Sequence, residues 1–305
     1  MKAGKKNVPF MATRGERIFY KINNVVMLVL IAITVYPMLY VVFCSFSNPD
    51  EYAFQMGRLL LRPAGFSIQG YRTIISMNTI WQGYRNTLMY VVLGTGISMM
   101  ITIMGAFILS HPDFMLKRVT MALVVFTMYF SGGMIPMYLV VTQLKLTNSI
   151  WGFLLPGAVS VYNLIVLRTA FNSVPKALLE SAEIDGAGDL TVLFHIVLPL
   201  STASLATIGL FYAVTFWGSW YNALVYLQKR RDLYPLQMIL RELLITDKTT
   251  DSMVTAYNGQ AANQYLLKEI VKYCAIVVST LPILAVYPFI QKYFVKGIML
   301  GAIKE

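Results

Sequence analysis

This 305-residue chain has few charged residues, and their scarcity indicates the class of protein. Only 13% of the residues are charged, 57% are hydrophobic, and the mean hydropathy is +0.62. An ordinary soluble domain has about 25% charged residues. Long stretches without Asp, Glu, Lys or Arg recur along the sequence, and a helix that crosses a bilayer needs roughly 20 apolar residues. The composition therefore predicts an all-α polytopic membrane protein.

Cysteine and histidine are scarcer still. The chain has two cysteines, Cys44 and Cys274, and two histidines, His111 and His195, all far apart in the sequence. Disulfide-stabilised folds are rich in cysteine, and metal centres need ligands at short spacing. The sequence therefore predicts two packed thiols and no metal site.

Six uncharged runs are long enough to cross a membrane. The predicted transmembrane helices are about 25–47, 87–110, 119–142, 150–167, 201–227 and 273–290. They define one transmembrane domain, 25–291, between a basic N-terminal segment, 1–24, and a C-terminal tail, 292–305. In the second run, small residues predict a face for close helix packing. These are Gly94, Gly96, Ser98 and Gly105.

The runs lack the groups that other classes of membrane protein use. A carrier driven by an ion gradient generally places ionisable side chains within the membrane, although sodium sites built from carbonyl and hydroxyl oxygens remain open. The sequence contains no GxxxxGK[ST] phosphate loop. It also shows no nucleophile with a base, and no carboxylate pair, near a membrane face. We therefore expect a protein that is not an enzyme and that binds no cofactor itself.

Basic residues gather before the first run, opposed by a single acidic residue. They are Lys2, Lys5, Lys6, Arg14, Arg17 and Lys21. Cytoplasmic flanks of membrane helices carry an excess of Lys and Arg, so the N-terminus is predicted in the cytoplasm, and six spans return the C-terminus there. Basic residues in the outer segments 48–86 and 228–272 weaken this bias, but long loops are largely exempt from the rule. The net charge of +11 indicates contact with anionic lipid rather than with nucleic acid.

A polar, acidic segment interrupts the apolar chain between the fourth and fifth runs, on the predicted cytoplasmic side. A short helix from Pro175 to about Asp185 is expected, with Ser173 as its N-cap. Gly186 would stop this helix in a left-handed turn, and Asp189 would cap a second short helix. The result is a helix-turn-helix loop with exposed carboxylates, suited to docking on a partner. An idle solvated loop is the alternative that the chemistry alone leaves open.

The spacing of this segment resembles the EAA loop of bacterial ABC importer permease subunits, with the pattern EAA, two residues, DGA, eight residues, I, one residue and LP. The matching residues are Glu180, Ala182, Asp185, Gly186, Ala187, Ile196, Leu198 and Pro199, with Ser181 in place of an alanine. The resemblance extends along nearly the whole chain to the carbohydrate group, and the chain is similar to the smaller maltose permease subunit. The run 131–136, SGGMIP, resembles the branch for complex oligosaccharides, including uronate-containing ones.

The resemblance implies a type I ABC importer permease fold in the bacterial cytoplasmic membrane. It implies a heterodimer with a second permease subunit, two ATPase subunits that hold ATP and Mg²⁺, and an extracytoplasmic sugar-binding protein. The loop within 171–200 would act as a coupling helix in a cleft of the ATPase, and the tail would also reach toward the ATPases. The function implied is ATP-driven import of sugars, with oligosaccharides as the expected substrates. The alternatives are a secondary carrier of a small polar solute and a structural scaffold.

Aromatic and hydrogen-bonding side chains crowd the end of the fifth run. Sugars present flat C–H faces and many hydroxyl groups, so such side chains are candidates for a substrate path. The candidates are Tyr212, Phe216, Trp217, Trp220, Tyr221 and Asn222, with Tyr129, Ser131 and Asn163 on neighbouring runs. An aromatic belt at the membrane interface is the alternative explanation.

Overall fold

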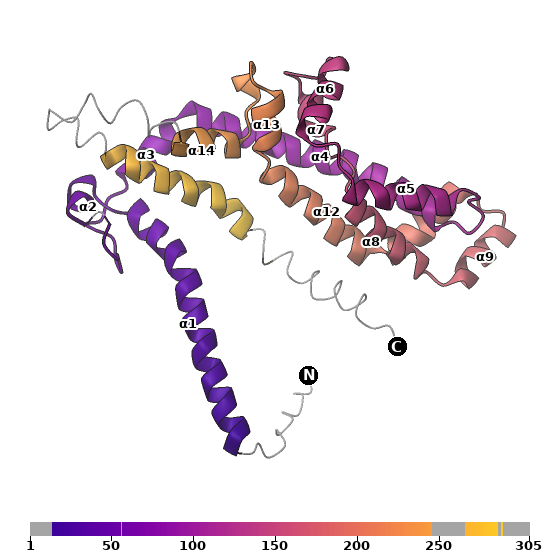
Figure 1. Cartoon of the computed structure of the whole chain (residues 1–305), viewed down its shortest axis with the longest axis horizontal. Coiled ribbons are helices and arrows are strands. Elements are labelled where there is room, and N and C mark those ends of the chain that lie inside the picture. Colours follow the sequence, from indigo (N-terminus) through magenta and orange to yellow (C-terminus); the bar gives the residue numbers. More distant parts are fainter. Residues whose placement is uncertain (1–13, 56, 246–265, 286–287, 289–305) are drawn as a thin grey trace. The chain divides into compact units, whose positions relative to one another are not determined.

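The protein is mostly helical in the part of the chain that the computed structural model describes, residues 14–55, 57–245, 266–285 and 288 (Figure 1). Within these ranges, β structure is limited to an isolated antiparallel bridge between Ser47 and Phe66. The chain divides into two compact units, Met1–Thr73 with Val254–Val277, and Ile74–Met253 with Val278–Glu305.

The first unit contains one long helix and short ones around its end. They are α1 (Arg14–Ser45), α2 (Pro49–Gln55), the first half of α3 (Gln69–Ser76) and the first part of a helix over 266–285. No residue in the most apolar window of α1 is buried by described parts of the chain. A helix that is apolar on all sides is typical of a membrane-embedded segment.

Hydrogen bonds gather at the C-terminal end of α1. The Ser45 and Tyr71 hydroxyls lie 2.7 Å apart, and the Cys274 thiol donates to the Ser45 carbonyl over 3.2 Å. Cys44 and Cys274 are both buried and unpaired, as the sequence predicts. The first unit thus closes around the point where α1 ends.

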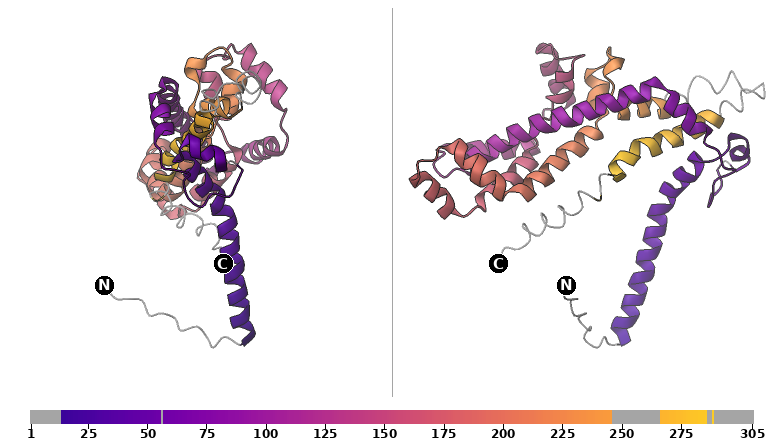
Figure 2. Two further views of the ribbon diagram at one scale, coloured as in Figure 1. Left: turned by 90° about the vertical axis from the view of Figure 1, so that its left-hand side faces the viewer. Right: turned by 180° about the vertical axis from the view of Figure 1, so that it is seen from behind.

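The second unit is built on three helices that pack side by side, α4, α8 and α12 (Figures 1 and 2). Its helices are α4 (Asn78–Ser110), α5 (Lys117–Tyr129), α6 (Met134–Gln143), α7 (Ile150–Leu154), α8 (Val161–Asn172), α9 (Lys176–Ile184), α10 (Asp189–Val192), α11 (Leu198–Leu200), α12 (Thr202–Trp217), α13 (Tyr221–Tyr226) and α14 (Leu236–Ile245). A π-helical turn, Leu193–Val197, joins α10 to α11, and a 3₁₀ turn, Arg231–Leu233, precedes α14.

Small residues of α4 allow its close packing, as predicted, with one exception. A Cβ atom on Gly94 would lie 2.6 Å from the Phe216 ring of α12, and one on Gly105 would lie 3.1 Å from Leu164 of α8. Ser98 is fully buried. A Cβ on Gly96 would meet nothing within 4 Å, so the inclusion of Gly96 in this face was wrong.

The predicted third run is two helices rather than one. α5 and α6 meet at a bend of 115°. Gly133, immediately before α6, has φ +85°, a conformation that glycine adopts without steric cost. The Gly133 N–H donates to the Ser131 hydroxyl over 3.1 Å, which fixes this bend.

The fourth and fifth runs are also interrupted. Pro156 and Gly157, with φ +84° at the glycine, lie between α7 and α8. The fifth run breaks after Trp217, where Gly218 caps α12, and resumes at Tyr221. At the α7–α8 break, the proline lacks an N–H and the glycine adopts left-handed backbone, and both interrupt a helix. Gly218 has φ −81°, so left-handed backbone does not explain the second break.

Two helices in the described ranges are long and apolar enough to cross a membrane, Gly15–Ser45 and Asn78–Ser110. The number rises to four if each bent pair, α5 with α6 and Asp189–Leu200 with α12, counts as one span. The helix of the sixth run is already present at residue 266, where the described residues resume, ahead of the predicted start at 273. The other predicted spans remain predictions, and the tail 292–305 lies outside the described residues.

Candidate functional site

The acidic loop folds as a helix, a tight turn and a second helix. α9 ends at Ile184, and Gly186 takes the left-handed conformation with φ +79°. The Gly186 N–H donates to the Glu183 carbonyl over 3.0 Å, and the Ala187 N–H donates to the Ala182 carbonyl over 2.9 Å. This pair of bonds is a Schellman motif, which satisfies the last carbonyls of α9. The predicted role of Gly186 as a left-handed cap is confirmed.

The two predicted helix starts were wrong by one or two residues. Ser173 caps the end of α8 and donates to the Ala170 carbonyl, while Pro175 occupies the N-cap position of α9. Proline at 175 disfavours helical backbone for the residue before it. Gly188 rather than Asp189 is the N-cap of the second helix, with Asp189 in its first turn, where an acidic residue favours the helix dipole.

α9 presents two different faces. Leu179, Ala182 and Ala187 of the loop pack against the apolar core between α4, α8 and α12. Glu180, Ser181, Glu183, Asp185 and Gly186 are exposed. Ile184, an apolar residue, is also 86% exposed. The loop is therefore anchored by its small and apolar side chains while its acidic face remains open.

Pro199 explains the irregular helix that connects the loop to α12. Proline has no N–H and its ring clashes with the carbonyl four residues earlier, which here is His195. The chain responds with a π turn, in which the Leu198 N–H donates to the Leu193 carbonyl. Ile196 and Leu198 of the matched pattern are half-buried beside it. The helix then bends by 86° into α12.

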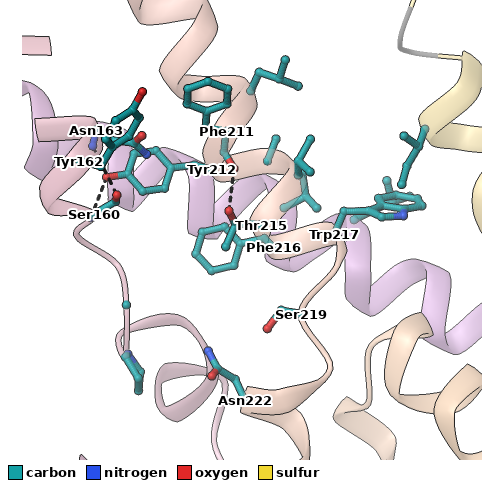
Figure 3. Close-up of a pocket in the computed structure, with 18 of the residues that line it drawn as sticks. Ser160, Tyr162, Asn163, Phe211, Tyr212, Thr215, Phe216, Trp217, Ser219 and Asn222 are labelled. Atoms are coloured by element: carbon teal, nitrogen blue, oxygen red, sulfur yellow. Dashed lines mark hydrogen bonds between the residues drawn. The ribbon is translucent and has the colours of Figure 1, made fainter. Parts of the chain in front are cut away.

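A cavity of about 1100 Å³ lies in the second unit (Figure 3). Its walls come from α4, the α7–α8 connection, α8, α12, α13 and the helix over 266–285. α12 contributes the largest share, an unbroken stretch from Leu210 to Trp217. The volume is slightly above the range of about 300–1,000 Å³ that is typical of small-molecule sites.

Hydroxyl and amide groups are held in place around this cavity. The Tyr212 hydroxyl accepts from the Ser160 N–H over 3.0 Å and lies 2.7 Å from the buried Thr102 hydroxyl. Asn222 donates from Nδ2 to the Phe153 carbonyl over 3.2 Å. The Asn163 side chain is 5% exposed and lines the same cavity. Figure 3 shows Ser160, Tyr162 and Asn163 near Tyr212, with Ser219 and Asn222 farther along the cavity.

None of the described lining residues carries a charge. Aromatic rings together with hydroxyl and amide groups suit a ligand with apolar faces and many hydroxyls. In the described part of the chain, no group of His, Cys, Asp and Glu residues could hold a metal ion. The cavity can therefore bind or pass a polar, uncharged surface by stacking and hydrogen bonding.

The structure brings together five of the nine predicted substrate-path residues. Tyr212, Phe216, Trp217, Asn222 and Asn163 all line the cavity. Trp220 and Tyr221 do not line the cavity, although they lie in the sequence between the lining residues Ser219 and Asn222. Their side chains are 38% and 43% exposed. Tyr129 is 81% exposed on α5, and Ser131 lies in the α5–α6 bend, so neither reaches the cavity. The role of these residues in transport remains a prediction.

Sequence reasoning missed the α7–α8 connection as a wall of the cavity. Pro156, Gly157 and Ser160 line it, because the break between α7 and α8 turns this stretch toward α12. Two features of the sequence indicate a helix break here. One is the Pro156–Gly157 pair, and the other is Ser160, which accepts from the Asn163 N–H as the N-cap of α8.

Comparison with known proteins gives relatives over nearly the full length of the chain. The chain is 39% identical over 289 residues to the polygalacturonan/rhamnogalacturonan transport system permease protein YtcP of Bacillus subtilis (strain 168), covering 95% of this chain and 99% of that protein. It is 37% identical over 293 residues to Protein LplC of the same organism, covering 96% and 97%. No protein-family model matches the chain.

A solved structure has the same fold. It is a chain of the crystal structure of a bacterial ABC transporter involved in the import of the acidic polysaccharide alginate. The TM-score is 0.85 and the sequence identity 32%, over 94% of this chain and 100% of that chain. Fold and relatives together define a membrane transport subunit. The chain belongs to the family of sugar ABC transporter permeases.

Proposed function

We propose that this chain forms half of the membrane pathway of an ATP-driven importer of oligosaccharides, and that its α9–α10 loop couples the pathway to a cytoplasmic ATPase. The observation that carries the proposal is the build of that loop. An exposed acidic helix is fixed by the Gly186 turn and by buried side chains to the helix bundle that lines the cavity. A push on α9 would therefore move α12 and the cavity wall.

The proposed partners follow from this role. A second permease subunit would complete the pathway, and two ATPase subunits would bind ATP and Mg²⁺ and close around α9. An extracytoplasmic binding protein would deliver the sugar. The chain itself would lie in the bacterial cytoplasmic membrane with both termini in the cytoplasm, and would bind no nucleotide.

Oligosaccharides are the proposed substrates for two reasons. The cavity offers aromatic rings beside the amide and hydroxyl groups of Asn163, Tyr212 and Asn222. Two of the relatives are named for the transport of polysaccharides, polygalacturonan/rhamnogalacturonan and alginate.

The proposed coupling needs side chains that an ATPase can reach. Glu180, Ser181 and Asp185 are exposed and would make these contacts.

The test replaces the residue that the turn depends on. In Gly186→Val a β-branched residue must adopt φ +79°, which costs about 1–3 kcal/mol, so the turn rearranges. We expect the reconstituted importer to continue hydrolysing ATP while sugar uptake falls by about tenfold.

Gly188→Ala is the matched control. Gly188 has φ −73° and a Cβ there would meet nothing within 4 Å, so hydrolysis and uptake should stay coupled. Glu180→Lys, which reverses an exposed charge without touching the turn, should also uncouple the two activities. Wild-type uptake in both Gly186→Val and Glu180→Lys would contradict the coupling role.

A further inference from the structure

Arg241 contacts an aromatic residue, Trp220, whose neighbour in the sequence, Ser219, lines the cavity. Its guanidinium carbon is 4.9 Å from the centre of the Trp220 ring. Trp220 stands in the sequence between Ser219 and Asn222, both of which line the cavity. No ion pair joins Arg241 to a carboxylate among the described residues.

The nearby acidic residues are occupied by other arginines. Between residues 219 and 245 the carboxylates are Asp232 and Glu242. Arg230 binds Asp232 with two hydrogen bonds of 2.8 and 2.7 Å, which lower the pKa of the Asp232 carboxyl. Arg231 pairs with Glu242 at 3.3 Å. Arg241 is therefore the arginine of this stretch that is left without a counter-charge.

The position of Arg241 is fixed by the elements around it. α14, which carries Arg241, packs against α4 and α13. The buried Thr87 hydroxyl accepts from the Leu236 N–H over 2.8 Å at the start of α14. Asn86 donates from Nδ2 to the carbonyls of Asp232 and Tyr234 over 2.8 and 3.0 Å. These bonds fix the backbone at the start of α14, and the guanidinium itself contacts the Trp220 ring. A side chain that is ordered in this way loses less entropy on binding.

The side chains of Trp220, Tyr221 and Arg241 together suit the binding of a sugar acid. Trp220 and Tyr221 are partly exposed aromatic rings in edge contact at 5.9 Å, and aromatic rings pack against the C–H faces of sugars. A guanidinium donates two parallel hydrogen bonds to a carboxylate. Aromatic rings alone would select any sugar, whereas the addition of an unpaired arginine selects one that carries a carboxylate.

We propose that Arg241, seated on Trp220, binds the carboxylate of an acidic sugar residue at the edge of the cavity, and so selects uronate-containing oligosaccharides. The inference rests on the proposed function, because it assigns a specificity residue to the same pathway. The uncharged cavity would then carry the hydroxyl and C–H surfaces of the sugar chain, while Arg241 recognises the charge.

The experiment uses the complete importer in proteoliposomes. The probes are a short oligogalacturonate and a short alginate oligomer, each compared with its carboxyl-reduced, neutral counterpart. We expect Arg241→Gln to lower the ratio of acidic to neutral uptake by about tenfold or more, the effect of losing a charge-assisted pair. Arg241→Lys, which keeps the charge without the planar fork, should retain part of the preference.

Lys229→Gln is the control for a general field effect. It removes the same charge from an exposed position in the same segment, so the ratio should not change. Equal loss of acidic and neutral uptake in Arg241→Gln, or an equal shift of the ratio in Lys229→Gln, would overturn the assignment. A wild-type importer that carries only the neutral probes would overturn it as well. A wild-type importer that carries no oligosaccharide with ATP would instead contradict the proposed function.

Discussion

Gly94 illustrates how a single residue sets both packing and cavity shape. It is buried in α4 opposite the Phe216 ring, and the same ring forms part of the cavity wall. Because Phe216 is itself 5% exposed, it has little room to move. The absence of one methyl group at position 94 thus holds α4 against α12 and keeps Phe216 in the wall.

Gly94→Ala should therefore destabilise the protein. The new Cβ would lie 2.6 Å from ring atoms of Phe216, and overpacking of this kind costs about 1–3 kcal/mol. We expect a lower thermal midpoint of the detergent-solubilised importer together with reduced sugar uptake. Gly96→Ala, on the same helix but in open space, is the control; an equal loss in both variants would show that helix packing at 94 is not the cause.

Arg241 and Gly186 are both single residues with a proposed role, but different information indicates that role. Gly186 stands in a sequence pattern, and its backbone conformation agrees with that pattern. Arg241 carries no motif. Its interest comes from a ring contact and from the pairing of its neighbours, which only side-chain positions reveal.

The start of α4 is the element that fixes the segment before α14. Gln82, Asn86 and Tyr90 donate to carbonyl groups between Asp232 and Tyr234. Thr87 accepts the Leu236 N–H. Residues on one face of α4, spaced by three and four positions, thereby satisfy backbone groups of an irregular segment that would otherwise be buried without partners.

Thr87→Val tests this arrangement. The variant keeps the shape of the side chain but removes the acceptor, which leaves a buried N–H unsatisfied at a cost of about 1–3 kcal/mol. We expect the thermal midpoint of the solubilised importer to fall, and the acidic-to-neutral uptake ratio to fall with it because α14 carries Arg241. Thr87→Ser retains the hydroxyl and should preserve both quantities. If the serine variant loses as much as the valine variant, the hydroxyl is not the reason.

The absence of charge did not predict the breaks inside the third, fourth and fifth runs. The third, fourth and fifth runs were predicted from their lack of charge, and hydropathy does not distinguish one straight helix from two bent ones. Gly133 and Gly157 both take positive φ at the breaks. Each freed backbone group needs a partner inside a membrane protein, and the Ser131 hydroxyl supplies one at the α5–α6 bend.

At the scale of the whole molecule, the source of energy separates the proposed importer from a secondary carrier. The predicted spans contain no Asp, Glu, Lys or Arg, and the cavity wall carries no charge among its described residues. Proton relays and most ion-coupled sites need such groups. In the proposed function, the loop at α9 instead couples the pathway to an ATPase.

Uptake by proteoliposomes that contain the complete importer should therefore require ATP and no ion gradient. With ionophores present to collapse proton and sodium gradients, we expect ATP to support the full initial rate of oligosaccharide uptake. Without ATP, an imposed gradient should give only the background rate. Gradient-driven uptake in the absence of ATP would favour the carrier, and radiolabelled substrate accumulation measures the difference.

The sequence by itself determined the class of protein, because repeated uncharged runs of about 20 residues are typical of membrane-spanning helices and because the acidic pattern from Glu180 to Pro199 stands at a spacing that chance rarely produces. It also determined the turn at Gly186, since only a residue without a Cβ adopts that backbone freely. The tertiary structure decided the rest. The cavity combines Ser160, Asn163, Tyr212 and Asn222 from separate elements, and no local pattern encodes which distant segments meet. Among the described residues Arg241 forms no ion pair, while Arg230 and Arg231 pair with the two nearby carboxylates. This arrangement depends on folded geometry rather than on position in the chain.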